Sequence, residues 1–346
     1  MTNKFHINKD IRKAKTLHSD FYKDQIIFDK FKKDIFLHSW QFFLQRKQIK
    51  DKASPGIFMP DLISEPFVLT QDNNQIDCLS NVCTHRGHMV CNNSKNTKSL
   101  TCRYHGRTFN LDGTIKNAPG FDDALNFPSK TDNLIKFNIK NWMDFIFISL
   151  KDSMHIDSVL NDIESRLVTF PFKELSFSES LSNEFEIDVH WAIYCENYLE
   201  GFHVPFVHKG LSKEISNDTY ETVLLKNGCV QYAKSYKSEE IYGYYYWIFP
   251  NMMFNFYPWG LSINIVKPIS NDLTKVSFRS YVFDKSKLNQ GAGSDLQKVE
   301  EEDEFVVQNV HIGLKSSFYK AGRFSPTKEQ GVHHFHNLLS VFMNSN

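Results

Sequence analysis

The sequence predicts a two-domain protein of the α+β class. Its 346 residues exceed one ordinary domain and suit two. From about residue 55 to residue 150, short strands alternate with turn signals, whereas helix-like spacing of apolar residues precedes that region and recurs after it. Hydrophobic residues make up 41% of the chain and aromatic residues 14%, enough for two buried cores. We therefore expect opening helices, a small β-domain, and then a larger domain in which helices pack on a sheet.

The charge balance and the apolar runs exclude several classes of partner. Lys+Arg and Asp+Glu number 40 each, so no global field attracts nucleic acid or an anionic membrane surface. No run approaches the ~18 uncharged apolar residues of a membrane helix, and prolines interrupt the most apolar region, residues 242–261. The opening residues lack the apolar core of a signal peptide, so we expect a cytoplasmic protein. In that compartment, the six cysteines favour metal ligation or free thiols over disulfides.

The first 150 residues divide into helices and then strands. Residues 10–48 carry apolar side chains at helical spacing, which predicts N-terminal helices, assigned as residues 1–42, that pack on the larger domain. Asp112-Gly113 is a typical hairpin turn. The β-domain, residues 43–150, is expected to contain strands at 66–70, 76–80 and 145–150 and a hairpin at 108–117.

The larger domain, residues 151–346, mixes both kinds of element. An amphipathic helix is expected at 154–170, and a helix entered from Asp188 is expected at 191–208. Segments rich in Tyr, Phe and Ile predict strands at 177–189 and several more between 222 and 283, with closing helices at 295–316 and 327–342.

Two short loops of the β-domain carry metal-binding residues. Cys83 and His85 form a C-x-H loop, and Cys102 and His105 form a C-x₂-H loop after sixteen intervening residues. A structural zinc site accepts two cysteines and two histidines, but such sites usually pair Cys with Cys and His with His. Here each loop pairs one Cys with one His, which suits a Rieske cluster, where one iron binds both cysteines and the other both histidines.

A second metal constellation lies in the larger domain. His203 and His208 are five residues apart, and Pro205 between them should break the helix. Two imidazoles and one carboxylate on one face of an iron leave positions open for O₂ and substrate. The alternative is a pair of hydrogen-bonded histidines at a helix end. The acidic run 300–304, taken by itself, is typical of a solvated helix face.

Together the two constellations resemble a known family. C-T-H-R-G at 83–87, C-R-Y-H-G at 102–106 and the following F-x-L-D-G hairpin are similar to the Rieske domain of ring-hydroxylating oxygenases. Glu200-x₂-His203-x₄-His208 matches the family's iron-binding motif, Asp/Glu-x₂-His-x₄-His. The resemblance implies that Cys83, His85, Cys102 and His105 ligate a [2Fe–2S] cluster, and that His203 and His208 bind a mononuclear iron. Arg107 stands where these families often carry Trp.

The resemblance also assigns roles around the iron. Glu200 would not bind iron but would link His203 to His105 of a neighbouring subunit and carry the electron between them. Asn197 would line the iron pocket. The stretch 300–319 resembles the family region Glu-Asp-x₄-Glu-x₂-Gln-x-Gly-Leu-x-Ser, which makes Asp303 the third ligand, with Gly313, Leu314 and Ser316 setting the register. The sequence departs from that region at Gln308 and His311.

The aromatic stretch 242–266 bears on the substrate. It resembles a region of choline- and betaine-oxidising Rieske enzymes, and Glu at position 200 occurs in the branch that acts on quaternary amines. Alternation along strands sends one set of rings to the core and another toward the iron. We assign Tyr246, Phe254, Phe256 and Trp259 to the substrate pocket, where they would hold an ammonium group by cation–π attraction; core packing is the alternative.

The resemblance implies a Rieske β-domain followed by a helix-grip (START-like) catalytic domain with an antiparallel sheet. The expected function is that of a terminal oxygenase that hydroxylates or N-demethylates a small quaternary or methylated amine. Electrons would come from NAD(P)H through a separate flavin/iron–sulfur reductase or a ferredoxin, because no nicotinamide motif is visible. A homotrimer or larger ring is expected. The alternatives are hydroxylation of an aromatic ring and a START-like ligand-binding module with a structural metal or electron-carrier domain.

Overall fold

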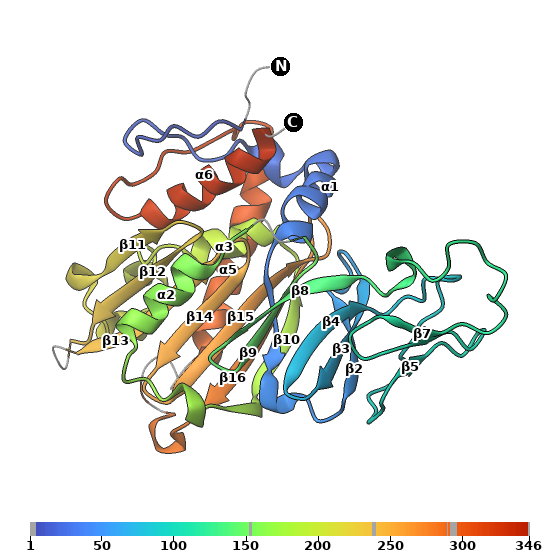
Figure 1. Cartoon of the computed structure of the whole chain (residues 1–346). Helices are drawn as coiled ribbons and strands as arrows, with labels where there is room; N and C mark the ends of the chain where they lie inside the picture. Colours follow the sequence, from blue (N-terminus) through green and yellow to red (C-terminus); the bar gives the residue numbers. More distant parts are fainter. Residues whose placement is uncertain (1–4, 152–153, 237–239, 289, 291–295, 345–346) are drawn as a thin grey trace. The chain divides into compact units, whose positions relative to one another are not determined.

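The computed structural model of the chain describes residues 5–151, 154–236, 240–288, 290 and 296–344. Two compact units make up the chain (Figure 1): a β unit, Leu37–Ser153, and an α+β unit formed by Met1–Phe36 and Met154–Asn346. The unit limits lie a few residues from the expected boundaries at 42/43 and 150/151. Among the described residues, no helix is long and apolar enough to cross a membrane.

The N-terminal segment contains less helix than its apolar spacing predicts. One α-helix, α1 (Gln25–Asp34), lies between two 3₁₀ turns, η1 (Ser19–Tyr22) and η2 (Phe36–His38). The helical spacing that runs to residue 48 was misleading, because Gln41–Gln45 form strand β1 of the β unit and overlap the end of the expected helical segment, residues 1–42. Phe42 of β1 packs its ring against Phe145 and Phe147, with centroids 5.8 and 5.9 Å apart. Burial against a paired strand therefore outweighs the local helical spacing.

The β unit contains two antiparallel sheets. The larger has the strand order β1-β9-β8-β4-β3-β2, and the smaller has the order β5-β6-β7. The expected hairpin is present between β6 and β7, where Gly113 has a φ of +86° and donates its N–H to the carbonyl of Asn110. The strands are β2 (Ala53–Phe58), β3 (Glu65–Asp72), β4 (Gln75–Ser80), β5 (Leu100–Thr101), β6 (Thr108–Phe109), β7 (Ile115–Asn117), β8 (Lys136–Trp142) and β9 (Phe145–Ser149).

The α+β unit is built on one antiparallel sheet with the strand order β10-β16-β15-β14-β13-β12-β11. These strands are β10 (Ser176–Ile187), β11 (Glu221–Leu225), β12 (Gly228–Lys234), β13 (Ile241–Ile248), β14 (Met252–Tyr257), β15 (Gly260–Pro268) and β16 (Thr274–Val282). Its helices after α1 are α2 (Asp157–Arg166), α3 (Trp191–Tyr198), α4 (Val204–Val207), α5 (Leu296–Leu314) and α6 (Gln330–Asn344). The remaining 3₁₀ turns are η3 (Arg46–Gln48), η4 (Lys130–Asp132), η5 (Phe172–Glu174), η6 (Leu211–Lys213), η7 (Asn217–Thr219) and η8 (Lys285–Lys287).

Different helices cover the two faces of this sheet (Figure 1). On one face, the Tyr246 hydroxyl of β13 donates to Asp162 of α2 at 2.7 Å. On the other face, Trp247 packs on Phe335 of α6 with ring centroids 5.1 Å apart, and α3 contacts both β15 and α5. Tyr245 shares this second face with Trp247, because side chains alternate along a strand. The second face, beneath α3 and α5, carries the candidate site.

The three histidines of α6 anchor that helix. The Nε2 atoms of His333 and His334 lie 2.7 and 2.8 Å from the backbone carbonyls of Asn8 and Leu225. His336 Nε2 lies 2.9 Å from a carboxylate oxygen of Glu196. Because the three rings bond to three different partners, they serve the packing of α6.

Candidate active site

The two expected iron-binding histidines lie at the two ends of the short helix α4. A single helix over 191–208, broken at Pro205, was the wrong prediction: α3 ends at Tyr198, and α4 begins at Val204. Pro205 lies in the first turn of α4, where its missing N–H breaks no helical hydrogen bond. His203 and His208 therefore occupy the N-cap and C-cap positions of this one-turn helix.

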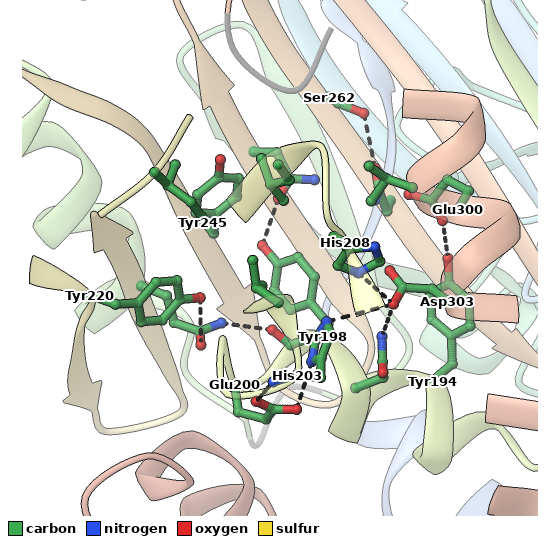
Figure 2. A pocket seen from close by; sticks show the side chains of 18 of the residues that line it. Tyr194, Tyr198, Glu200, His203, His208, Tyr220, Tyr245, Ser262, Glu300 and Asp303 are labelled. Carbon is green, nitrogen blue, oxygen red and sulfur yellow. Dashed lines mark hydrogen bonds and ion pairs between the residues drawn. The ribbon is translucent and has the colours of Figure 1, made fainter. Parts of the chain in front are cut away.

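Glu200 organises this turn. Its Oε2 accepts hydrogen bonds from the backbone N–H groups of Phe202 and His203, and its Oε1 lies 2.7 Å from His203 Nδ1. The contact fixes the imidazole with Nε2 directed away from the turn (Figure 2). The next residue must be glycine, because a Cβ on Gly201 would lie 2.4 Å from the ring of Tyr220.

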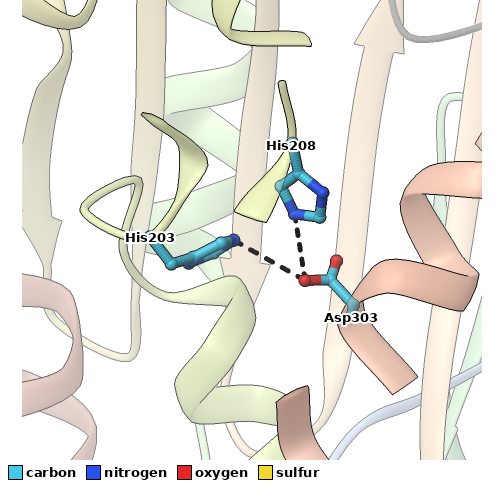
Figure 3. Close-up of side chains that lie close together, drawn as sticks. All are labelled: His203, His208 and Asp303. Carbon is cyan, nitrogen blue, oxygen red and sulfur yellow. Dashed lines mark hydrogen bonds and ion pairs between the residues drawn. The ribbon is translucent and has the colours of Figure 1, made fainter. Parts of the chain in front are cut away.

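His203, His208 and Asp303 converge on one point (Figure 3). Asp303 Oδ1 lies 3.0 Å from His208 Nε2 and 3.6 Å from His203 Nε2. Among the described residues, these three form the only group of at least three His, Cys, Asp or Glu whose donor atoms all lie within 4.8 Å of one another. Two imidazoles and one carboxylate are the donor set of non-haem Fe(II) sites, so these residues fit that metal.

Each of the two histidine rings also contacts a carboxylate through its Nδ1 atom, on the side opposite Asp303. Glu302 Oε2 lies 2.9 Å from His208 Nδ1, as Glu200 does from His203 Nδ1. Burial lowers the pKa of His208, but the hydrogen bonds with Asp303 and Glu302 outweigh burial and raise it. The surroundings of His208 therefore stabilise positive charge, which a cation site requires. Glu302 is adjacent to Asp303 in the acidic run, but it faces Nδ1 of His208 and not the Nε2 atom that Asp303 faces.

Asn197 holds the carboxylate of Asp303 in place. It lies on α3, and its Nδ2 donates to Asp303 Oδ1 at 2.7 Å. The same oxygen faces both histidines. Asn197 thus restricts the rotation of the Asp303 side chain, and it also lines the cavity beside the three residues, as expected.

A cavity of about 130 Å³ opens beside this group. That volume is close to the ~150 Å³ that accommodates benzene in an engineered protein cavity. The lining includes five tyrosines and three carboxylates, and among the described residues it includes no lysine or arginine. The lining residues are Tyr194, Asn197, Tyr198, Glu200, His203, Val204, His208, Leu211, Ile215, Tyr220, Gln231, Tyr245, Asn255, Tyr257, Ser262, Asn264, Phe278, Val299, Glu300 and Asp303.

The aromatic residues assigned to the pocket lie elsewhere, so that prediction was wrong. Tyr246 pairs with Phe254 across β13 and β14, on the face that α2 contacts. Phe256 packs on the rings of Phe170 and Phe172, and Trp259 stacks on Tyr257. The cavity is lined instead by the strand neighbours of these residues: Tyr245, Asn255 and Tyr257. The alternation was expected, but the face was assigned incorrectly.

Three residues that line the cavity were not predicted from the sequence, although their helical spacing from Asn197 and Asp303 indicates them. Tyr194 and Tyr198 lie on α3 within one turn of Asn197. Glu300 precedes Asp303 by three residues on α5 and therefore projects from the same face of the helix.

The two loops of the first constellation have matching turns. Gly87 donates its N–H to the carbonyl of Cys83 at 3.0 Å, and Gly106 donates to Cys102 at 3.0 Å. Both glycines have left-handed backbones, with φ of +70° and +76°. Residues with a Cβ rarely adopt this conformation, which explains the glycine after each metal-binding pair.

The four side chains of these loops separate into two pairs. Cys83 and Cys102 are buried, whereas the rings of His85 and His105, with centroids 4.8 Å apart, lie closer to the surface. A tetrahedral zinc would bring all four donor atoms within about 4 Å of one another. Among the described residues, these four do not form a group that could hold one metal ion, whereas His203, His208 and Asp303 do. A cysteine end and a histidine end therefore fit a two-iron Rieske cluster better than a single ion.

The protonation tendencies of this group suit metal ligation. Burial lowers the pKa of His85, and the positive charges of His105 and Arg107 lower it further, which favours the neutral imidazole that binds metal. Burial raises the pKa of the Cys83 thiol. Binding of the cluster therefore has to displace a thiol proton.

Arg107 occupies a buried position between the two loops. It is 3% exposed, donates from Nη1 to the Thr84 hydroxyl at 3.1 Å, and pairs with Asp132 at 3.7 Å. Its guanidinium lies over the rings of Phe121 and Phe127, 4.6 and 5.1 Å from their centroids. A planar cation that contacts two aromatic rings thus occupies the site where the family often carries tryptophan.

Comparison with known proteins agrees with this architecture. Residues 39–130 match the Rieske [2Fe-2S] domain, and residues 176–345 match the ring hydroxylating alpha subunit (catalytic domain). The chain is 28% identical over 361 residues to a chloroplastic choline monooxygenase of Arabidopsis thaliana, covering 95% of this chain and 83% of that protein. It is 26% identical over 360 residues to the carnitine monooxygenase oxygenase subunit of Escherichia coli K12, covering 95% and 94% of the two chains.

Solved structures show the same fold. A crystal structure of the quaternary ammonium Rieske monooxygenase CntA superposes with a TM-score of 0.79 at 23% identity and covers 99% of this chain and 98% of that chain. A naphthalene 1,2-dioxygenase superposes with a TM-score of 0.72 at 15% identity and covers 100% and 96%. The expected α+β fold and the expected cofactors, a Rieske cluster and a mononuclear non-haem iron, are thereby confirmed at the level of the family. The chain belongs to the family of Rieske-type non-haem iron oxygenase α-subunits.

Proposed function

We propose that this chain is the terminal oxygenase subunit of an enzyme that hydroxylates or N-demethylates a small quaternary or methylated amine. The observation that carries the proposal is the cavity beside His203, His208 and Asp303, which combines tyrosines with carboxylates. Aromatic faces attract a quaternary ammonium group, and buried carboxylates add a favourable field for a cation. The names of the relatives, choline and carnitine monooxygenases, support the same substrate class.

The residues around the iron site have separable tasks. His203, His208 and Asp303 would hold the iron, which supplies activation of O₂ when it is bound. Glu200 and Glu302 hold the outer nitrogens of the two histidines, and Asn197 holds the Asp303 carboxylate. The tyrosines and the apolar side chains orient the substrate and exclude water from the reacting carbon.

The proposal includes partner proteins. Electrons from NAD(P)H would reach the cluster through a separate reductase or ferredoxin, and Glu200 would link His203 to His105 of a neighbouring subunit in a trimer or larger ring. Phe202 and Phe206, beside Glu200, are 44% and 73% exposed, as expected of residues that a neighbouring subunit covers. In the β unit, His105 and its stacking partner Tyr104 are exposed as well. A cytoplasmic location remains a prediction.

Hydroxylation of an aromatic ring is the alternative reaction for the same centre. The likeness to naphthalene 1,2-dioxygenase concerns the fold alone, and aromatic walls suit an aromatic substrate as well. The carboxylate Glu300 in the cavity disfavours it, because a neutral ring offers that group no counter-charge. A ligand-binding module without oxygenase activity would leave the converging iron donor set unexplained.

A substrate screen tests the proposal. The iron-loaded protein, supplied with a surrogate reductase, should show NADH and O₂ consumption that depends on choline, a betaine or carnitine, with formation of an oxidised or demethylated product. Naphthalene and benzoate serve as the aromatic comparison. Turnover of the aromatic compounds alone would contradict the amine proposal, and consumption of O₂ without any product would favour the binding module.

The wall formed by β13 offers a matched pair of variants. Tyr245→Leu removes an aromatic face from the cavity and should weaken choline binding by about 30-fold, the effect of one desolvated cation–π contact. Tyr244→Leu is the control, since the adjacent side chain points to the opposite face, where its ring contacts Tyr232. Calorimetric titration of both variants measures the difference. Equal choline affinity in the two variants would show that Tyr245 does not contact the cation.

A further inference from the structure

Glu300 is a carboxylate of the cavity that the iron site does not employ. It lies on α5 three residues before Asp303, which places it about 4.5 Å further along the helix on the same face. Figure 2 shows both carboxylates projecting from this helix toward the cavity. Asp303 faces the two histidines, whereas Glu300 contacts neither of them.

The other carboxylates near the cavity are engaged in the metal centre. Glu200 is bonded to His203 and to the backbone of its own turn, and Glu302 is bonded to His208. Glu300 accepts one hydrogen bond, at Oε2 from the Tyr194 hydroxyl at 2.5 Å. Among the described residues, Oε1 accepts none. A carboxylate with a fixed orientation and one open oxygen is therefore directed at the space that the substrate would fill.

The surroundings of Glu300 favour a pairing with a cation. Burial raises the pKa of Glu300 to about 8, so the anion is costly in this place without a positive partner. The lining contains no lysine or arginine among the described residues. Burial raises the pKa of Tyr257, and the charge of Glu300 adds to the rise, which sets a second aromatic residue near the carboxylate. An aromatic wall with a carboxylate is the chemistry that recognises a methylated ammonium group.

We propose that Glu300 is the anionic anchor for the ammonium group of the substrate and thereby sets the enzyme's selectivity for cations over neutral molecules of the same shape. This inference rests on the proposed function and names the residue that recognises the substrate class. An ammonium nitrogen held at Glu300 directs the carbon atoms bonded to it toward Asp303, one helical turn away. Those carbons are the ones attacked in both N-demethylation and hydroxylation next to nitrogen.

The experiment compares choline with its neutral isostere, 3,3-dimethylbutan-1-ol, in which a tert-butyl group replaces the trimethylammonium group. Binding is measured by anaerobic calorimetry on the protein with both metal sites loaded. The unsubstituted protein should bind choline more tightly than the isostere. Glu300→Gln, which keeps the shape and removes the charge, should weaken choline binding by about 30-fold or more and leave the affinity for the isostere within about twofold. In turnover, KM for choline should rise more than kcat falls.

Two controls separate anchoring from a merely structural role. Glu301→Gln makes the same charge change at the next residue of α5, which is exposed and does not line the cavity, and it should leave the choline affinity unchanged. Glu300→Asp keeps the charge and should retain part of the preference for choline over the isostere. This variant tests the anchor independently if Glu300→Gln folds poorly.

The outcomes distinguish this inference from the proposed function. If choline and other quaternary amines are turned over but Glu300→Gln binds choline as tightly as the unsubstituted protein, the anchor is overturned and the proposed function stands. If the unsubstituted protein binds choline no better than the isostere, the anchor is overturned directly. If only aromatic compounds are turned over, both proposals fail together.

Discussion

Replacing Asp303 with alanine is expected to empty the mononuclear iron site and leave the Rieske cluster intact. Asp303 is the point on which both histidine Nε2 atoms converge, at 3.0 and 3.6 Å. With two imidazoles alone, the site loses its negatively charged donor and one of its three ligands, so iron should fall from about three atoms per chain to about two. Iron quantification and the EPR spectrum of the reduced cluster measure the two sites separately. Substrate oxidation should drop to background.

Glu301→Ala is the matched control for that variant, because it removes an exposed carboxylate two residues away on the same helix. It should retain about three irons per chain. If Asp303→Ala also retained them, the third ligand would be a different carboxylate. Glu302 would then be the first to test, since its Oε2 already lies 2.9 Å from the His208 ring.

Glu200→Gln should leave both metals bound and slow the passage of electrons between them. Its Oε1 lies 2.7 Å from His203 Nδ1, so the carboxylate holds the outer side of an iron-binding ring. An amide keeps the shape but loses the charge that stabilises a proton on that nitrogen. Loss of such a partner typically reduces activity by about 10- to 100-fold. Stopped-flow oxidation of the pre-reduced cluster in the presence of O₂ and substrate gives the rate directly.

Glu302→Gln supplies the comparison for this effect. Glu302 has the same relation to His208 that Glu200 has to His203, with Oε2 2.9 Å from Nδ1. If Glu200 carries the electron, the Glu200 variant should be slower than the Glu302 variant at equal iron content. Equal rates in the two variants would mean that both carboxylates only orient their rings. An undiminished rate in Glu200→Gln would refute the link to the neighbouring subunit.

Local patterns predicted the metal motifs and much of the β unit. Cys83 with His85, Cys102 with His105, and His203 with His208 are each separated by only a few residues, so chain geometry alone holds each pair together. Gly87, Gly106 and Gly113 have left-handed backbone conformations. Glycine adopts this conformation far more readily than other residues, so these turns could be recognised in the sequence by their glycines. Asp303 was assigned through the family resemblance, and the structure brings it to the histidines from almost a hundred residues away.

The predictions failed where the local sequence was compatible with more than one secondary structure. At those places, contacts with distant segments determined which structure formed. Residues 41–45 had helical spacing, yet burial of Phe42 against Phe145 and Phe147 made them a strand. Pro205 suggested a break in a helix but lies at the start of one, because Glu200 organises the turn before it.

The substrate pocket shows most clearly what the sequence determined and what it did not. The sequence predicted aromatic strands beside the iron site, with side chains that alternate between two faces. It did not determine which face, because every residue of β14 is buried and no polar-to-apolar alternation marks the two sides. The helices on each side of the sheet decide it. The face of Tyr246 contacts α2, whereas the two ends of α4 hold His203 and His208, and α5 holds Asp303 and Glu300, over the face of Tyr245 and Asn255. The direction in which a buried side chain points follows from what packs on each side of its sheet, and only the tertiary structure contains that information.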